Sequence, residues 1–254
     1  MRYSITLSYD GSAFCGWQIQ PNAPSVQETL QTALGTLLGQ PVGVVGAGRT
    51  DTGVNASCFV AHFDSPAGEL DCSDLCYKLN AILPCSVAIF SIQRVADDFH
   101  ARFDARRREY TYFLHRRKDP FVEKYSYLCA YPTLDFEQMN EAAQLLLGTH
   151  DFRCFEKTGS GNKTSVCTIF EAEWRKGEAP CALCAGSPDD YWAFHIAGDR
   201  FLRNMVRAIV GTLIEVGRGK RTAASISGLI GNGSRSDSGE SVPGQALFLS
   251  GIEY

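Results

Sequence analysis

Hydrophobic and polar positions alternate along some segments of the chain and recur at helical spacing along others. Residues 2–9, RYSITLSY, alternate and are rich in β-forming residues, which predicts a strand followed by a turn. The segment 25–39, SVQETLQTALGTLLG, begins with an S-x-x-E capping pattern and continues with apolar residues at helical spacing. Its last residue, Gly39, is typical of a helix end, so we predict a helix here.

The same two patterns predict the remaining elements. We expect further helices at about 73–83, 135–147 and 201–217, and strands at about 57–63, 86–95, 109–114, 164–175, 191–197 and 247–254. The polar, glycine-rich stretch 228–245 predicts a mobile loop. Strands and helices therefore follow one another similarly in both halves, which predicts an α+β fold of two similar units with largely antiparallel sheets. We place an N-terminal domain at 1–105 and a C-terminal domain at 106–254.

Composition narrows the class of protein. The chain has 254 residues, 44% of them hydrophobic and 20% charged, which is typical of a soluble globular protein. No leader pattern opens the sequence, and no stretch approaches the roughly 18 apolar residues of a membrane span, so we expect a cytoplasmic protein. The ten cysteines are scattered, which favours buried thiols over disulfides. Only Cys181 and Cys184 have zinc-knuckle spacing, and the sequence lacks a second pair to complete four ligands.

Basic side chains are concentrated in two stretches, although the net charge is −4. The first contains Arg106, Arg107, Arg108, His115, Arg116, Arg117 and Lys118, and the second contains Arg200, Arg203, Arg207, Arg218, Lys220 and Arg221. Local basic stripes on an acidic chain are compatible with a polyanion bound in one groove. Charge alone favours the simpler interpretation, that these are ordinary solvated faces.

The glycine-rich stretch 43–56, GVVGAGRTDTGVNA, carries one arginine and one carboxylate, Arg49 and Asp51. Its first eight residues have Walker A spacing except for the arginine, but a P-loop opens a helix, whereas this turn leads into a predicted strand. A glycosidase would need a second carboxylate in a comparable setting. Two interpretations remain. Either Asp51 accepts amide hydrogens within a structural turn, or it is a nucleophile whose ionised form Arg49 favours.

The stretch GRTDTGVNA resembles the GRTDxGVHA signature of the tRNA pseudouridine synthase A (TruA) family. Other segments agree with the family in order and spacing: YDGSAFCGWQIQ (9–20), SVQETL (25–30), KLNAILP (78–84), FHARFDARRREYTYFL (99–114), LLGTHDFRCF (146–155) and FLRNMVRAIVGTLIEVG (201–217). The match covers nearly the whole chain, and its GRTD and FHARF…R-x-Y-x-Y blocks are specific. The sequence is therefore identified as a member of this family.

The resemblance implies a pseudouridine synthase fold with a central cleft, and isomerisation of a tRNA uridine without cofactor or metal. Asp51 matches the family's catalytic aspartate, which attacks either the ribose C1′ or the uracil C6; both routes stay open. Arg207 matches the arginine that pairs with that carboxylate, and Tyr110 matches the tyrosine that stacks on the target uracil. Arg49 matches the turn arginine and is expected to contact the RNA.

The partner that the resemblance implies is the anticodon stem-loop of tRNA, modified at positions 38 to 40 by a homodimer. Phosphate contacts are expected from the basic residues Arg106, Arg107, Arg108, Arg116, Arg117, Lys118 and Arg203. Two positions depart from the family signature: Thr52 replaces the usual alanine and Asn55 the usual histidine. The main alternative is a non-catalytic paralogue that binds structured RNA, and a zinc-dependent nucleic-acid-binding protein is a further one.

Overall fold

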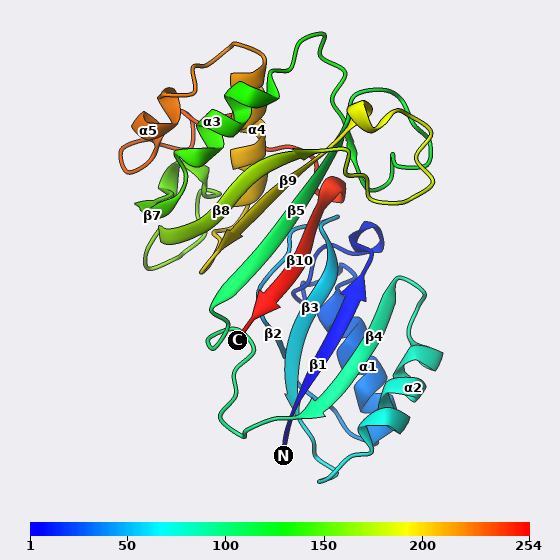
Figure 1. The fold of residues 1–254 in the computed structure, drawn as a ribbon. Coiled ribbons are helices and arrows are strands. Elements are labelled where there is room, and N and C mark those ends of the chain that lie inside the picture. Colours follow the sequence, from blue (N-terminus) through cyan, green and yellow to red (C-terminus); the bar gives the residue numbers. More distant parts are fainter. The chain divides into compact units, whose positions relative to one another are not determined.

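The computed structural model describes residues 1–254 and contains two compact units. Unit 1 comprises Met1–Arg106 together with Leu249–Tyr254, and unit 2 comprises Arg107–Phe248. Helices pack against mainly antiparallel strands in each unit, so the fold is α+β as predicted (Figure 1). The C-terminal residues return to unit 1, whereas the predicted domains assign them to the second. None of the helices combines the length and apolar character that a membrane span requires.

The sheet of unit 1 consists of β1 (Arg2–Tyr9), β2 (Val44–Gly46), β3 (Asn55–Asp64), β4 (Val87–Arg94) and most of β10 (Leu247–Glu253). The strand order is β4-β1-β3-β10. The short strand β2 also pairs with β3, where Val44 lies opposite Phe63. Strand β1 runs antiparallel to β3, with Arg2 opposite Asp64. Half-buried and buried positions alternate along all of β1, which confirms the strand that its sequence pattern predicts.

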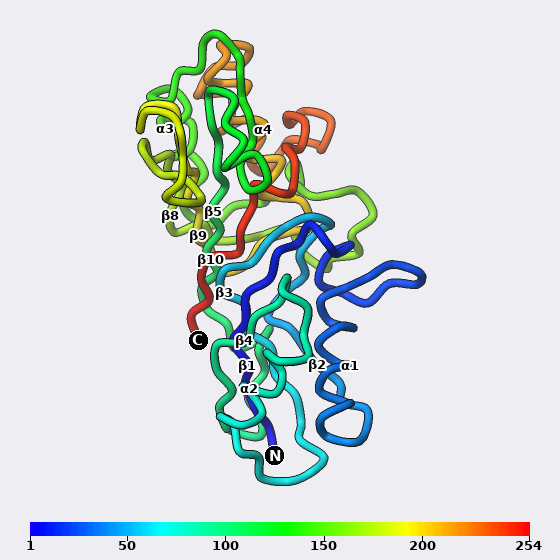
Figure 2. Tube along the Cα trace, turned by 90° about the vertical axis from the view of Figure 1, so that its right-hand side faces the viewer, coloured from blue at the N-terminus to red at the C-terminus, as the bar shows by residue number.

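Two helices of unit 1, α1 (Val26–Leu38) and α2 (Cys72–Ile82), pack against each other and against this sheet (Figure 2). Helix α1 begins where predicted, because the hydroxyl of Ser25 accepts the Glu28 N–H at 3.2 Å. It ends at Gly39, whose φ of 74° terminates the helix. Helix α2 begins slightly earlier than predicted because the carboxylate of Asp71, rather than a serine, caps its first turn.

Unit 2 contains β5 (Arg107–His115), β6 (Tyr127–Leu128), α3 (Phe136–Gln144), β7 (Gly148–Asp151), β8 (Val166–Lys176), β9 (Tyr191–Gly198), α4 (Met205–Gly217) and α5 (Ser225–Leu229). The strands β5-β9-β8-β7 are antiparallel, and β6 pairs in parallel with β5, so the sheet is mixed. Helices α3 and α4 cover one face of it (Figure 1). There the ring of Phe136 stacks on Trp192, with centroids 3.6 Å apart.

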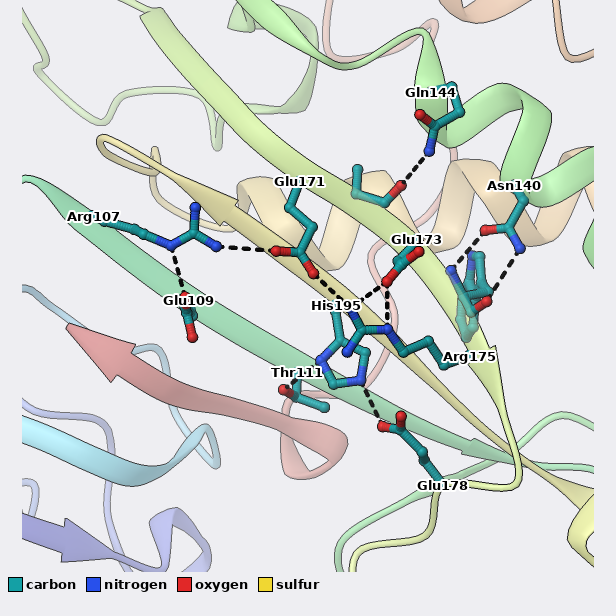
Figure 3. Close-up of polar contacts among 12 residues, drawn as sticks. Arg107, Glu109, Thr111, Asn140, Gln144, Glu171, Glu173, Arg175, Glu178 and His195 are labelled. Atoms are coloured by element: carbon teal, nitrogen blue, oxygen red, sulfur yellow. Dashed lines mark hydrogen bonds and ion pairs between the residues drawn. The ribbon is translucent and has the colours of Figure 1, made fainter. Parts of the chain in front are cut away.

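The other face of the unit 2 sheet carries a network of charged side chains (Figure 3). Glu171 is paired with Arg107 at 3.0 Å and with Arg175 at 2.8 Å. Further along the sheet, His195 contacts Glu178 at 2.6 Å. Because these side chains are partly exposed, each pair contributes at most about 1 kcal/mol to stability. Their main effect is to keep this face polar.

Helix α4 begins later than the sequence pattern predicts. The apolar spacing starts at Phe201, but the helix starts at Met205. Asn204 adopts the left-handed conformation with φ 68°, which cannot continue a right-handed helix. Its side-chain amide donates to the Ser241 hydroxyl at 2.6 Å, so a contact distant in sequence fixes the start of the helix.

The stretch 228–245 is not the mobile loop that its composition predicts. Its second half lies against α4, where a Cβ on Gly211 would approach the Glu240 carbonyl oxygen to 1.8 Å. The Gly239 N–H donates to the Thr212 hydroxyl at 2.9 Å in the same contact. The prediction was wrong here because glycine and serine permit close backbone packing as readily as they permit mobility.

A buried histidine of unit 1 is expected to make the protein less stable as the pH falls. His62 is 4% exposed, and its Nδ1 accepts the Ala101 N–H at 3.0 Å. Burial, assisted by Arg2 and His100, lowers the pKa of His62 from 6.5 to about 4. The unfolded chain therefore binds a proton at a higher pH than the folded chain. The contribution of His62 to the free energy of unfolding is therefore fully present above pH 6.5. It is lost as the pH falls toward about 4, which lowers the free energy of unfolding by up to about 3 kcal/mol.

Urea unfolding of the wild type and of His62→Gln at about pH 7.5 and about pH 5 measures this effect. We expect the wild type to lose about 2 kcal/mol more than the variant between the two conditions. His115 of unit 2 is also buried with a lowered pKa, and it remains in both proteins. The difference between the two proteins therefore isolates His62. Parallel pH profiles would contradict the expectation.

Candidate active site

The loop between β2 and β3, residues 47–54, carries the predicted catalytic residue Asp51. The chain turns at Gly53, with φ 76°, and the Val54 N–H donates to the Asp51 carbonyl at 3.1 Å. Strand β3 follows at once, beginning at Asn55. Since a P-loop must open a helix, the structure excludes the Walker A interpretation of this stretch.

The segment that follows β1 contacts this loop on both sides of the carboxylate. The Trp17 N–H donates to the Thr50 carbonyl at 3.3 Å, and the Gly53 N–H donates to the Phe14 carbonyl at 3.4 Å. The hydroxyls of Tyr9 and Thr50 lie 2.9 Å apart. The backbone before and after the aspartate is thus bound to one neighbouring segment, which fixes the position of the loop.

Glycines allow this close approach. Gly16 has a φ of 97°, and a Cβ there would lie 2.3 Å from the Thr50 carbonyl oxygen. A Cβ on Gly46 would lie 2.6 Å from the indole of Trp17, which itself stacks on Phe59 at 4.1 Å between centroids. No sequence pattern indicated that these residues support the loop. The available sequence signal for this close packing was Gly16, which directly precedes Trp17.

The two departures from the family signature lie in different environments. Asn55 is 1% exposed, and its Oδ1 accepts the Gly11 N–H at 2.8 Å. A Cβ on Gly11 would lie 2.2 Å from the Val54 carbonyl oxygen, so the asparagine joins two closely packed backbones. Thr52, by contrast, is exposed. Asn55 is therefore a structural support of the aspartate loop.

The side chains of the loop remain accessible. Asp51 is half-buried and Arg49 is exposed, and both belong to the same short turn. A carboxylate on a fixed backbone that still reaches solvent can attack a substrate carbon or transfer a proton when the substrate enters. A half-buried carboxylate on a fixed loop is compatible with the nucleophile that the sequence predicts.

The structure holds no cluster of three or more His, Cys, Asp or Glu side chains that could bind a metal ion. Cys181 directs its thiol toward the Phe121 carbonyl oxygen, 3.7 Å away, and both Cys181 and Cys184 are half-buried free thiols. The zinc interpretation therefore lacks the ligands it needs.

The two tyrosines of β5 have different surroundings in unit 2. Tyr112 is fully buried, and its hydroxyl donates to the Pro243 carbonyl at 3.1 Å. Burial raises the pKa of Tyr112 well above its usual value. Tyr110 is half-buried and meets Phe201 edge-on, with centroids 5.1 Å apart. Tyr112 is thus part of the core, whereas Tyr110 is partly exposed to solvent.

Arg207 lies in the first turn of α4 and is half-buried. Its Nε donates to the Val242 carbonyl at 2.7 Å, and the Val242 N–H donates back to the Arg207 carbonyl at 3.2 Å. The segment that sequence analysis read as a mobile loop therefore orients this guanidinium. Asp51 and Arg49 belong to unit 1, and Tyr110 and Arg207 belong to unit 2.

The predicted phosphate-binding residues fall into two groups. Those exposed to solvent are Arg106, Arg117, Lys118 and Arg203. Those half-buried with protein partners are Arg107, which pairs with Glu171; Arg108, which donates to the Asp199 carbonyl; and Arg116, which donates to the Tyr131 carbonyl. The first group is the better suited to bind a phosphate, since its side chains are accessible.

Comparison with known proteins identifies the family to which the chain is similar. The profile of a family described as tRNA pseudouridine synthase matches residues 5–104 and 142–254. A tRNA pseudouridine synthase A of Bacteroides thetaiotaomicron is 49% identical over 253 residues, covering 100% of this chain and 90% of the relative. The protein of the same name in Bacteroides fragilis is 48% identical, covering 100% and 96%. That of Bacillus licheniformis is 39% identical, covering 100% and 99%.

A solved structure, the archaeal box H/ACA sRNP Nop10-Cbf5 complex, matches 82% of this chain and 45% of that chain. Its TM-score of 0.36 and sequence identity of 12% are too low to establish a shared fold.

The family profile and the sequence relatives define the class as an RNA-modifying isomerase. The chain belongs to the tRNA pseudouridine synthase family. Its activity is that of a pseudouridine synthase in tRNA modification.

Proposed function

We propose that this enzyme converts uridine to pseudouridine in the anticodon stem-loop of tRNA, with Asp51 as the nucleophile. The observation that carries the proposal is the fixed aspartate loop. Hydrogen bonds to Thr50 and Gly53 bracket Asp51, while its side chain stays half-exposed. The relatives' printed name, tRNA pseudouridine synthase A, supports tRNA as the substrate.

The reaction needs no co-reactant. The Asp51 carboxylate attacks either the ribose C1′ or the uracil C6, and the N1–C1′ bond breaks. The uracil turns and its C5 bonds to C1′, and the bond between the Asp51 oxygen and the substrate breaks, which frees the carboxylate. The C5 proton is lost and N1 gains one, so substrate and product are isomers. A general acid–base group and a fixed nucleophile are sufficient for these steps.

Tyr110 and Arg207 are proposed to act on the same uridine as Asp51, in the central cleft that the family resemblance implies. The half-buried ring of Tyr110 can stack on a base, a contact worth roughly 1–3 kcal/mol. That offsets part of the few kcal/mol spent in unstacking the nucleotide. The guanidinium of Arg207, oriented by Val242, is proposed to pair with the carboxylate.

RNA binding outside the target uridine is proposed to use the exposed residues Arg49, Arg106, Arg117, Lys118 and Arg203. Phosphate contacts of this kind position the RNA without reading its sequence, and they weaken as salt rises. The functional unit is proposed to be a homodimer.

Site-specific pseudouridine formation tests the proposal. The purified protein is incubated with unmodified tRNA transcripts that carry uridine at position 38, 39 or 40, and products are mapped by carbodiimide modification and primer extension. We expect pseudouridine at these positions. A transcript with uridines only in its other arms is the matched control and should stay unmodified.

The rival function is a non-catalytic protein that binds structured RNA. It predicts tRNA binding without product in the same assay. Product confined to another arm of the tRNA would retain the catalytic part of the proposal and overturn the anticodon assignment.

A further inference from the structure

A turn of unit 1 presents an aromatic ring to solvent. Phe103 is 74% exposed, more than most large apolar side chains of the protein. The guanidinium of Arg102 lies 5.8 Å from the centre of its ring, and the imidazole of His100 lies 4.2 Å from it with the planes tilted by 32°. Three planar, conjugated side chains thus gather within four successive residues.

The backbone holds these side chains in place. Ala101, at the centre of the turn, is fully buried; its N–H donates to His62 and its carbonyl accepts the Tyr254 hydroxyl at 2.9 Å. The Nδ1 of His100 lies 3.2 Å from the Arg102 N–H and 3.3 Å from the Phe103 N–H and accepts from both. The turn is therefore anchored by contacts with two distant parts of the chain, His62 and Tyr254.

The Asp104 side chain completes the turn. Its Oδ2 accepts the His100 N–H at 2.7 Å, and its own N–H donates to the His100 carbonyl at 3.0 Å. These bonds close the turn, and the guanidinium of Arg102 lies beside the exposed ring.

Single exposed apolar residues are common and need no explanation by themselves. Here, however, the ring stands on an anchored turn between an arginine and a histidine. Aromatic rings with adjacent arginines are the surface on which proteins stack unpaired nucleobases, while the guanidinium binds phosphate or stacks as well. A protein partner would require a far larger apolar area, about 800 Å² on each side, and the neighbours of Phe103 in the turn are charged or polar.

We propose that Phe103, with His100 and Arg102 beside it, stacks an unpaired base of the tRNA, at a contact distinct from those assigned to the target uridine. This inference rests on the proposed function, because it takes tRNA as the ligand. Rigid presentation lowers the entropy cost of the contact, since neither the turn nor the ring must be ordered on binding.

Binding of unmodified tRNA transcript to Asp51→Asn protein, which prevents turnover, provides the test. We expect Phe103→Ala to weaken binding by about fivefold to a hundredfold, and Phe103→Trp to restore it. Arg102→Ala should lower the slope of log affinity against log salt by about 1, whereas Phe103→Ala should leave that slope unchanged. Phe90→Ala, which removes another exposed phenylalanine of unit 1, is the matched control and should bind like the parent.

A photoreactive phenylalanine analogue at position 103 identifies the occupant directly. A crosslink to a tRNA nucleotide supports the inference. A crosslink to a second copy of the chain, or a Phe103→Ala protein that binds tRNA as tightly as Phe90→Ala does, overturns it. Failure of the unsubstituted protein to modify tRNA would instead contradict the proposed function, so the two failures are distinguishable.

Discussion

Replacing Asp51 with asparagine is expected to lower the rate of pseudouridine formation by at least about a thousandfold while tRNA affinity changes by no more than a few-fold. Asparagine has the same shape as aspartate, and the backbone bonds of the loop run through Thr50, Gly53 and Val54, so the turn should keep its conformation. Its amide, however, is neither a nucleophile toward carbon nor a base. Single-turnover assays on a transcript, with binding measured separately, distinguish loss of chemistry from loss of substrate.

Asp71→Asn is the matched control for this variant. Asp71 caps α2 through its carboxylate, and asparagine is an equally good cap, so the same chemical change there should leave both turnover and stability near wild type. If Asp51→Asn still forms product at a rate comparable with Asp71→Asn, the assignment of the nucleophile is wrong.

The regular elements could be predicted from sequence because local patterns determine them. Alternation along β1 and the cap at Ser25 both act over a few neighbouring residues. Strands β2, β6 and β7 were missed because they are too short to show a period. The start of α4 was misplaced because the conformation of Asn204 depends on a bond to Ser241, far along the chain.

The same distinction applies to the candidate site. Arg49 and Asp51 are two residues apart in one turn, and the family resemblance was sufficient to select them. The groups that support them are distant in sequence: Asn55 bonds to the Gly11 N–H across 44 residues, and Arg207 bonds to Val242 across 35. No periodicity or spacing reports such pairs. The sequence therefore predicts the candidate reactive residues, and the structure adds the hydrogen bonds that hold them in place.

Replacing Gly16 with alanine is expected to disable the enzyme without touching any reactive group. The φ of 97° is unfavourable for alanine, and the new Cβ would lie 2.3 Å from the Thr50 carbonyl oxygen. That oxygen belongs to the backbone and cannot move by a change of rotamer, so the loop must shift. Backbone strain and overpacking together should lower the free energy of unfolding by about 2–4 kcal/mol.

Activity should fall further than stability explains. A displacement of about 1 Å at a nucleophile can cost a hundredfold in rate, and Thr50 directly precedes Asp51. We therefore expect Gly16→Ala, assayed at a temperature where circular dichroism shows it folded, to lose at least about a hundredfold in turnover. Gly48→Ala is the matched control, because a Cβ there meets nothing within 4 Å although it lies in the same loop as the aspartate. If folded Gly16→Ala turns over as fast as Gly48→Ala, the fixed position of the loop is not what catalysis requires.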